Sequence, residues 1–305
     1  MMVLVILAAA TGMVIKIQYN ARSALARADR GFQEGRLRVA AADMARNLLQ
    51  VLADDEDLLV DHWSEDWAAE FELEYPDGVT ARGRIMDEQR LFDMNNLTAV
   101  RPEKAGETAE RVVGEIMREC ALRDTELGLD ALMDWVDEDG EGQFESRYYS
   151  QKDVVYKCPD SFMLGLNELE HIAGWSRNMF KQKAEDAETA LKDCLTALPV
   201  GRREPLRVNV NTAPPVVLQS ILGGGNAQLV ELLVSMRRDS PLRSVSIIES
   251  VVGSRRMSIL EPFLDVKSRF FRINVECALN GQRERLDVLA ERLADGEMQV
   301  MRWGY

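Results

Sequence analysis

The sequence predicts an α+β protein in which a long N-terminal helix packs on an antiparallel sheet and a large all-α domain is inserted into that sheet. Three observations predict this: an unbroken helical pattern at the start of the chain, apolar–polar alternation in two separate places, and helical periodicity between them. The 305 residues are 46% hydrophobic and 29% charged, which is typical of globular proteins and excludes collagen-like and low-complexity classes.

The first expected element is a helix that is apolar all round at its start and has one apolar face afterwards. Residues 1–15 carry no charge, and apolar positions then recur at helical spacing as far as Val51. The acidic cluster 54–57 ends the pattern. Such a helix is about 75 Å long, which is too long for the core of a compact domain. We therefore expect a membrane or filament stem that carries a globular head; a coiled-coil or core helix is the alternative.

The apolar run is short for a membrane span. A helix over residues 1–15 measures about 22 Å, against a hydrocarbon core of about 30 Å. Three explanations fit: a cleaved signal peptide, a buried core helix, or a chain that begins upstream of Met1. No turn signal follows the run and the helical pattern continues, which favours the third.

Two hairpins are expected, one on each side of the helical region. Residues 67–86 alternate apolar and polar around the turn signal Pro76-Asp77-Gly78. Residues 271–291 do the same around Asn280-Gly281, a strong type I′ turn. The economical arrangement is one antiparallel sheet packed on the stem helix, with the helical residues inserted between the hairpins.

The residues between the hairpins are expected to be mainly helical. Residues 96–200 predict helices with loops, and the extended stretch Leu206–Val210 leads to Thr212, which we expect to cap the helix that Pro214 begins. We divide the chain into a membrane or stem helix at 1–60, the first part of the sheet at 61–95, an inserted α-domain with an acidic loop at 96–205, a second helical module at 206–265, and a C-terminal hairpin that completes the sheet at 266–305.

Three stretches, taken in order, resemble one protein family. They are 85–97 (IMDEQRLFDMNNL), 132–139 with the following Glu145, and 208–214 (VNVNTAP). Together they resemble general secretion pathway protein K, the large minor pseudopilin of type II secretion systems, and the resemblance extends along essentially the whole chain. It implies a pilin-like fold, in which a stem helix packs on a sheet, with a large inserted all-α domain of SAM-like or helix-hairpin-helix-like form.

The resemblance also implies a function in assembly rather than catalysis. A protein of this family is expected to cross the inner membrane once and to hold its head in the periplasm. It is expected at the tip of the pseudopilus, in complex with the I and J minor pseudopilins, where it initiates pseudopilus formation and protein export. No enzymatic activity is implied.

The segment from Asp124 to Glu145 holds nine acidic residues and no basic one. Such crowding raises carboxylate pKa values and destabilises a fold unless a cation relieves it. Oxygen ligands around a glycine turn suit Ca²⁺, although the spacing is shorter than that of an EF-hand loop. The family resemblance independently implies calcium at Asp134, Asp137, Asp139 and Glu145. A solvated acidic face is the alternative.

The balance of charge argues against general nucleic-acid binding, but one segment favours it. The chain has 37 Lys and Arg against 51 Asp and Glu, a net charge of −14, which is unfavourable for contact with phosphates. Residues 201–256 nevertheless carry eight arginines against four acidic residues. Residues 211–238 resemble a helix-hairpin-helix unit, which can donate backbone N–H groups to phosphates. A membrane-anchored nucleic-acid-binding protein is therefore the alternative function.

The four cysteines, at positions 120, 158, 194 and 277, match no zinc or redox motif. In an oxidising periplasm, one disulfide among Cys120, Cys158 and Cys194 is a hypothesis that the sequence leaves open. Cys277 lies on the apolar side of a predicted strand, and we expect it to be a small buried hydrophobe.

Overall fold

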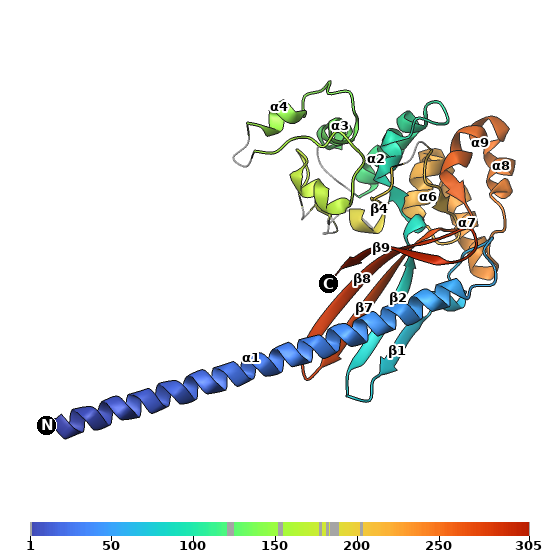
Figure 1. Ribbon diagram of the computed structural model, residues 1–305. Coiled ribbons are helices and arrows are strands. Elements are labelled where there is room, and N and C mark those ends of the chain that lie inside the picture. The colour runs from blue at the N-terminus through green and yellow to red at the C-terminus, as the bar shows by residue number, and fades with distance from the viewer. Residues whose placement is uncertain are drawn as a thin grey trace. The chain divides into compact units, whose positions relative to one another are not determined.

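The computed structural model describes residues 2–120, 125–151, 155–176, 179–180, 183, 189–201 and 204–304, without the side chains of residues 3–10, 14 and 125. The chain divides into two compact units, and each is described by itself (Figure 1). Unit 1 comprises Met1–Asp55, Asp66–Met86 and Arg272–Tyr305, and unit 2 comprises Glu56–Glu65 and Asp87–Phe271. The finer division into five segments stays a prediction.

Unit 1 combines a long helix with an antiparallel sheet, as the sequence predicts. The helix α1 runs unbroken over Met2–Ala53 (Figure 1). Within the described chain the strands follow the order β1-β2-β7-β8-β9, and the pairs β1–β2 and β8–β9 are antiparallel. Both expected hairpins are confirmed, whereas β9 has no counterpart among the predicted elements. The remaining elements are η1 Asp66–Ala68, β1 Glu70–Glu74, β2 Thr80–Asp87, β7 Phe270–Leu279, β8 Gln282–Arg292 and β9 Met298–Gly304.

The second half of α1 packs on the sheet through one apolar stripe. The stripe consists of buried residues at steps of three and four, which is the spacing of one helix face: Leu37, Ala41, Met44, Leu48 and Leu52. Gly83 of β2 lies so close to this stripe that a Cβ atom there would be 2.5 Å from Leu48 Cδ1 and 3.0 Å from Met44 Cε. Glycine is therefore the residue that lets strand and helix approach.

Polar contacts fix the same helix to the turn between β1 and β2. The Tyr75 hydroxyl donates to the Asp43 carboxylate at 2.8 Å, and Arg36 pairs with Asp77 at 2.8 Å. Burial and the Asp43 carboxylate raise the pKa of Tyr75, so the phenol stays a neutral donor. These contacts set the register of α1 along the sheet.

The first half of α1 extends past the sheet and makes no buried contact through the side chains that are described. Leu37 is the first buried residue among them, and the large apolar side chains before it are exposed: Met2, Met13, Ile15, Ile17, Tyr19, Leu25 and Phe32. Most of the expected membrane segment, residues 1–15, lies outside the side chains that the structure describes. In the part of the chain that could be tested, no one helix combines the length and apolarity of a membrane span; only α6 and α7, taken together as a sharply bent pair, do so.

Unit 2 is mainly helical, with two short parallel strand pairs, β3–β4 and β5–β6. These pairs are two residues long, too short to produce an alternating pattern in the sequence. Its described elements are η2 Glu88–Arg90, β3 Phe92–Asp93, η3 Met94–Thr98, α2 Ala105–Glu119, α3 Thr125–Val136, α4 Ser146–Tyr149, η4 Leu166–His171, η5 Leu191–Asp193, β4 Leu195–Thr196, β5 Val208–Asn209, α6 Pro215–Leu222, η6 Gly224–Asn226, α7 Ala227–Asp239, α8 Ser246–Val252, α9 Ser254–Leu260, η7 Glu261–Phe263 and β6 Leu264–Asp265.

A buried carboxylate, Asp87, joins three segments of unit 2 that are distant in sequence. Its side chain accepts hydrogen bonds from the Thr212 hydroxyl at 2.5 Å, the Ser268 hydroxyl at 2.7 Å and the Asn209 amide at 3.1 Å. The expected capping role of Thr212 is therefore wrong. The helix α6 begins at Pro215 with Pro214 at the N-cap position and no side-chain cap, because the Thr212 hydroxyl is used by a buried carboxylate instead.

Buried asparagines hold the loops of unit 2 by hydrogen bonding both backbone groups of one residue. The Asn95 side chain accepts from Met163 N and donates to Met163 O, at 2.7 and 2.9 Å. Asn96 makes the same reciprocal pair with Leu206. Asn211 makes it with Leu242. Each side chain substitutes for a strand partner where the backbone has none.

Substitution at Gly83 tests the close approach of β2 to α1. Gly83→Val places a branched side chain against Leu48 and Met44, and we expect a loss of about 1–3 kcal/mol from overpacking. Gly35→Val is the matched control, because no atom lies within 4 Å of a Cβ at Gly35 and the helix position is exposed. We expect the control to change the free energy of unfolding by less than about 0.5 kcal/mol. Denaturant unfolding of both variants measures the difference, and equal losses would contradict the packing described here.

Candidate metal centre

The acidic loop lies between α3 and α4 in unit 2. Asp134 belongs to the last turn of α3, and Asp137 and Asp139 follow the end of that helix. Glu145 is the residue that precedes α4, and it exposes only 9% of its surface. Carboxylates at the C-terminal end of a helix face the negative end of its dipole, so this position disfavours them unless a cation is near.

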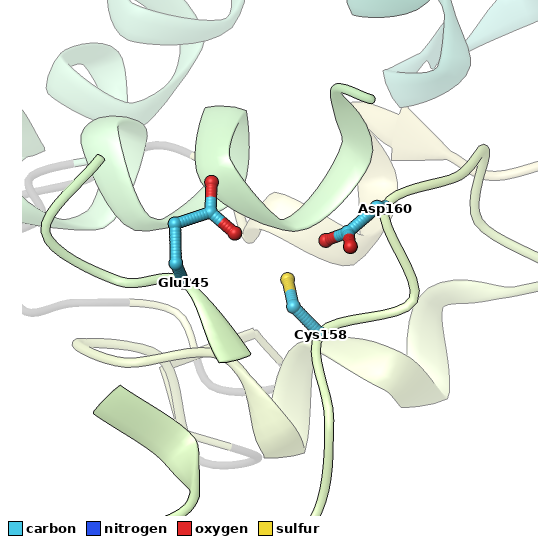
Figure 2. A group of neighbouring side chains, drawn as sticks. All are labelled: Glu145, Cys158 and Asp160. Atoms are coloured by element: carbon cyan, nitrogen blue, oxygen red, sulfur yellow. The ribbon is translucent and has the colours of Figure 1, made fainter. Parts of the chain in front are cut away.

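Carboxylates from the loop converge on one point. Single oxygen atoms of Asp137, Asp139 and Glu145 all lie within 4.8 Å of one another. Glu145 also belongs to a second group, in which one of its oxygens, Cys158 Sγ and an Asp160 oxygen lie within 4.8 Å of one another. Figure 2 shows the Cys158 thiol between the Glu145 and Asp160 carboxylates. Sequence reasoning missed Asp160 because it follows the loop at a distance that matches no ligand motif.

The fourth expected residue, Asp134, lies beside this group and holds the loop in place. Its Oδ2 accepts a hydrogen bond from Phe144 N at 2.7 Å. A Cβ at Gly142 would lie 2.2 Å from the same oxygen, so only glycine fits at that position. Asp139 turns the chain in a similar way, since its Oδ1 accepts from Glu141 N at 2.7 Å. The loop is thus shaped by carboxylate–backbone contacts of its own.

Three carboxylate oxygens in the cluster are buried without a hydrogen-bond partner among the described residues: Asp137 Oδ1, Glu145 Oε1 and Asp160 Oδ1. An unsatisfied buried oxygen is costly, and each one in a native fold requires an explanation. Carboxylate oxygens around a flexible loop are the ligands that Ca²⁺ prefers. The donor set therefore fits a hard divalent cation.

The charges in the loop oppose one another. Burial, followed by the charges of Asp139, Asp134 and Asp160, raises the pKa of Asp137 to about 6. Burial and the neighbouring carboxylates, with Asp160 the first of them, also raise the pKa of Glu145. In the absence of a cation, both carboxyl groups thus hold protons more tightly in the fold than in the unfolded chain.

Without a cation, the Cys158 thiol is held in its neutral form. Burial raises the pKa of Cys158 to about 12, and its sulfur donates to Asp134 O at 3.1 Å. A soft metal such as Zn²⁺ binds the deprotonated sulfur and would have to displace this proton. A hard cation needs only the carboxylate oxygens.

Four described arginines of the basic segment make polar contacts within the protein: Arg207, Arg237, Arg243 and Arg256. Arg256 donates to Leu222 O at 2.5 Å, and Arg237 donates to Val210 O at 2.7 Å. Arg111, from α2, donates to Ser220 O and Ile221 O, so the last carbonyls of α6 are satisfied by guanidinium groups. Arg202 and Arg203 lie outside the described residues. These contacts favour a packing role for the segment over a phosphate-binding one.

Comparisons with known proteins agree with the fold and with the resemblance found in the sequence. Residues 90–199, which include the candidate metal centre, match the first domain of the family "Type II secretion system (T2SS), protein K". The chain is 22% identical to type II secretion system protein K of Aeromonas hydrophila over 284 residues, which are 86% of this chain and 81% of that protein. It is 26% identical to the protein K of Pseudomonas aeruginosa over 253 residues, 79% of this chain and 70% of that protein.

A solved structure shares the fold. A chain in the crystal structure of the GspK-GspI-GspJ complex from enterotoxigenic Escherichia coli matches with a TM-score of 0.67 and 18% identity, over 91% of this chain and 98% of that one. A stem helix on an antiparallel sheet with an added helical region is a pilin-like fold. The resemblance found in the sequence is confirmed: the chain is similar to type II secretion system protein K, through the family model over residues 90–199 and through relatives aligned over most of its length.

The raised pKa of Asp137 predicts how stability depends on pH when divalent cations are removed. A folded-state pKa of about 6 lies above the value of the unfolded chain, so the stabilising contribution is present at low pH and is lost as pH rises through about 6. We expect the melting temperature of the full chain in a chelator to be a few degrees higher at pH 5 than at pH 7. Asp137→Asn should reduce this difference, and a melting temperature that rises from pH 5 to pH 7 would contradict the prediction.

Proposed function

We propose that this chain assembles with the I-type and J-type minor pseudopilins at the tip of the type II secretion pseudopilus, and that it thereby initiates pseudopilus formation and protein export. In this proposal α1 crosses the inner membrane once and the rest of the chain lies in the periplasm. The chain is a structural subunit and catalyses no reaction.

One observation carries the proposal: a stripe of exposed apolar side chains on α1. Leu25, Phe32 and Val39 are separated by steps of seven residues, so they lie on one face of the helix, and they expose 71%, 68% and 71% of their surface. Large apolar side chains in such a row favour packing against another helix. The stem of a neighbouring pseudopilin is the partner that we propose for this stripe.

The comparison structure supports the choice of partners. The E. coli protein with this fold was crystallised as a GspK-GspI-GspJ complex. The match covers 98% of that chain, so nearly all of the fold crystallised in that complex has a counterpart here. The size of unit 2 supports the tip position, because a large insertion in the head leaves less room for a further subunit stacked on it.

The polar residues of the sequence motifs support a structural role. Asn95, Asn96, Asn211 and Asp87 are buried and hydrogen-bonded to backbone or hydroxyl groups. A catalytic group instead has to reach substrate from a cleft. The hydrogen bonds of these four side chains therefore hold loops together.

We also propose that the acidic loop binds Ca²⁺, as expected from the sequence. Asp137, Asp139 and Glu145 would supply the first oxygens, and Asp160 would add one that the sequence did not predict. The three buried oxygens without hydrogen-bond partners support this proposal. Asp134 would keep the loop closed through Phe144 and add its charge to the field of the site.

Calorimetric titration of the chelator-stripped full chain with CaCl₂ tests the calcium proposal. We expect Glu145→Gln and Asp160→Asn each to weaken Ca²⁺ binding about tenfold or more, because each removes charge from a buried oxygen set. Glu141→Gln is the matched control, since it makes the same change in the same loop at an exposed residue outside the cluster. A hundredfold excess of Ca²⁺ over its dissociation constant should raise the melting temperature by about 5–10 °C. Equal weakening by all three variants would indicate diffuse attraction to an acidic surface.

Co-expression with the neighbouring I and J pseudopilins tests the assembly proposal. We expect the full chain to co-purify with both, and Phe32→Glu to reduce the recovered complex at least tenfold because it places a charge in the apolar stripe. Gly31→Glu introduces the same side chain one residue earlier, where no atom lies within 4 Å, and should leave recovery unchanged. Recovery that is equal for both variants would exclude the stripe as the contact, and absence of any complex would contradict the proposal.

A further inference from the structure

Two of the four cysteines lie next to each other in the core of unit 2. Cys120 ends α2, and Cys194 follows η5 directly before β4. Both are buried, and their thiols hydrogen-bond to each other. The structure records them as free thiols. The sequence left the pairing of the cysteines open, and this contact selects one pair.

The backbone on both sides of the pair is already fixed. Cys120 N donates to Ile116 O at 3.0 Å, and Cys194 N donates to Leu191 O at 2.9 Å. Cys194 O accepts from Phe92 N at 2.9 Å, as part of the contact between β3 and β4. A bond between the two sulfurs would therefore join two segments whose backbones are each held by hydrogen bonds of their own.

The other two cysteines are engaged elsewhere. The Cys158 thiol donates to Asp134 O and lies between carboxylates, where a thiolate is strongly disfavoured. Cys277 is buried in β7 of unit 1, as expected from the sequence, and burial raises the pKa of its thiol to about 11. Among the described cysteines, only Cys120 and Cys194 have a thiol as neighbour.

We propose that Cys120 and Cys194 form a structural disulfide when the chain folds in the periplasm. The proposal rests on the periplasmic location proposed above. The oxidant is a protein or small molecule that carries a reactive disulfide. Its S–S bond is reduced to two thiols as the Cys120 S–S Cys194 bond forms, so two electrons and the two cysteine protons pass to the oxidant.

Both residues are buried in the native fold, so the exchange takes place before the core closes. One of the two cysteines attacks the oxidant as the thiolate and forms a mixed disulfide. The other cysteine then loses its proton and attacks the sulfur of the first, and the second sulfur of the oxidant leaves.

The bridge would close a chain segment that contains the whole candidate metal centre. Asp137, Glu145 and Asp160 all lie between the two cysteines in sequence. A disulfide over a long segment stabilises mainly by restricting the unfolded chain. It would thus limit the freedom of the residues that must come together to bind a cation.

Thiol counting on the full chain, exported to the periplasm and unfolded without reductant, tests the proposal. We expect two free thiols per chain, four after reduction, and a Cys120–Cys194 linked peptide in a non-reducing digest analysed by mass spectrometry. Reduction should lower the melting temperature by about 5–15 °C. Cys194→Ser should abolish the effect of reductant, whereas Cys277→Ser, which changes a buried thiol in unit 1, should retain it. Four free thiols, or a linkage between another pair, would overturn the proposal.

A second measurement separates this proposal from that of location. Protease accessibility of unit 2 in spheroplasts reports whether the head is periplasmic. If the head is accessible to protease and the chain has four free thiols, the disulfide proposal is wrong and the proposed location stands. If the head is protected from protease, the proposed location is wrong, and the purified reduced chain is refolded with oxidised glutathione. Formation of the Cys120–Cys194 bridge then supports the pairing. Failure of the bridge to form refutes the pairing as well.

Discussion

The fold of the inserted residues depends on a contact between their first and last segments. A buried carboxylate, Asp87, makes that contact. The main segment of unit 2 runs from Asp87 to Phe271, and near its end the Ser268 hydroxyl donates to Asp87 at 2.7 Å. Next to this contact, Arg269 N donates to the Gln89 side chain at 2.6 Å. An unpaired buried carboxylate would be strongly destabilising, and burial does raise the pKa of Asp87. The hydrogen bonds from Thr212, Ser268 and Asn209 offset that cost only when all three segments are in place. The carboxylate thus selects one arrangement of the insertion.

The periodic elements could be predicted from the sequence, and the isolated polar contacts could not. The long helix and both hairpins repeat their apolar positions over many residues, so periodicity identifies them. The strand β9 was not predicted, because only some of its residues alternate in burial. Of the two-residue strands of unit 2, β5 lies in the expected extended stretch Leu206–Val210, and the others are too short to show a period. The capping role expected of Thr212 fails for a different reason: local chemistry offers the hydroxyl a helix end, but Asp87, far away in sequence, is the stronger acceptor.

The same distinction applies to the functional residues. Asp137, Asp139 and Glu145 are close in sequence, and the structure brings their oxygens together, whereas Asp160 joins them only through the folded path of the chain. The motif asparagines resemble a catalytic or binding set by composition. Their reciprocal bonds to Met163, Leu206 and Leu242 instead explain why a loop-rich insertion needs them, because these loops have few strand partners of their own.

The surroundings of the acidic loop disfavour its negative charges, and they support the proposed cation over a solvated acidic face. Asp134 and Asp137 lie at the end of α3 where the helix dipole disfavours negative charge, and their neighbours add repulsion that raises the pKa of Asp137 to about 6. A solvated acidic face would relieve these costs by turning its oxygens to water. Here oxygens of Asp137, Glu145 and Asp160 are buried without hydrogen-bond partners in the described chain. A divalent cation bound as proposed would offset the repulsion, the effect of the dipole and the unsatisfied oxygens together, whereas solvent cannot satisfy oxygens that are buried.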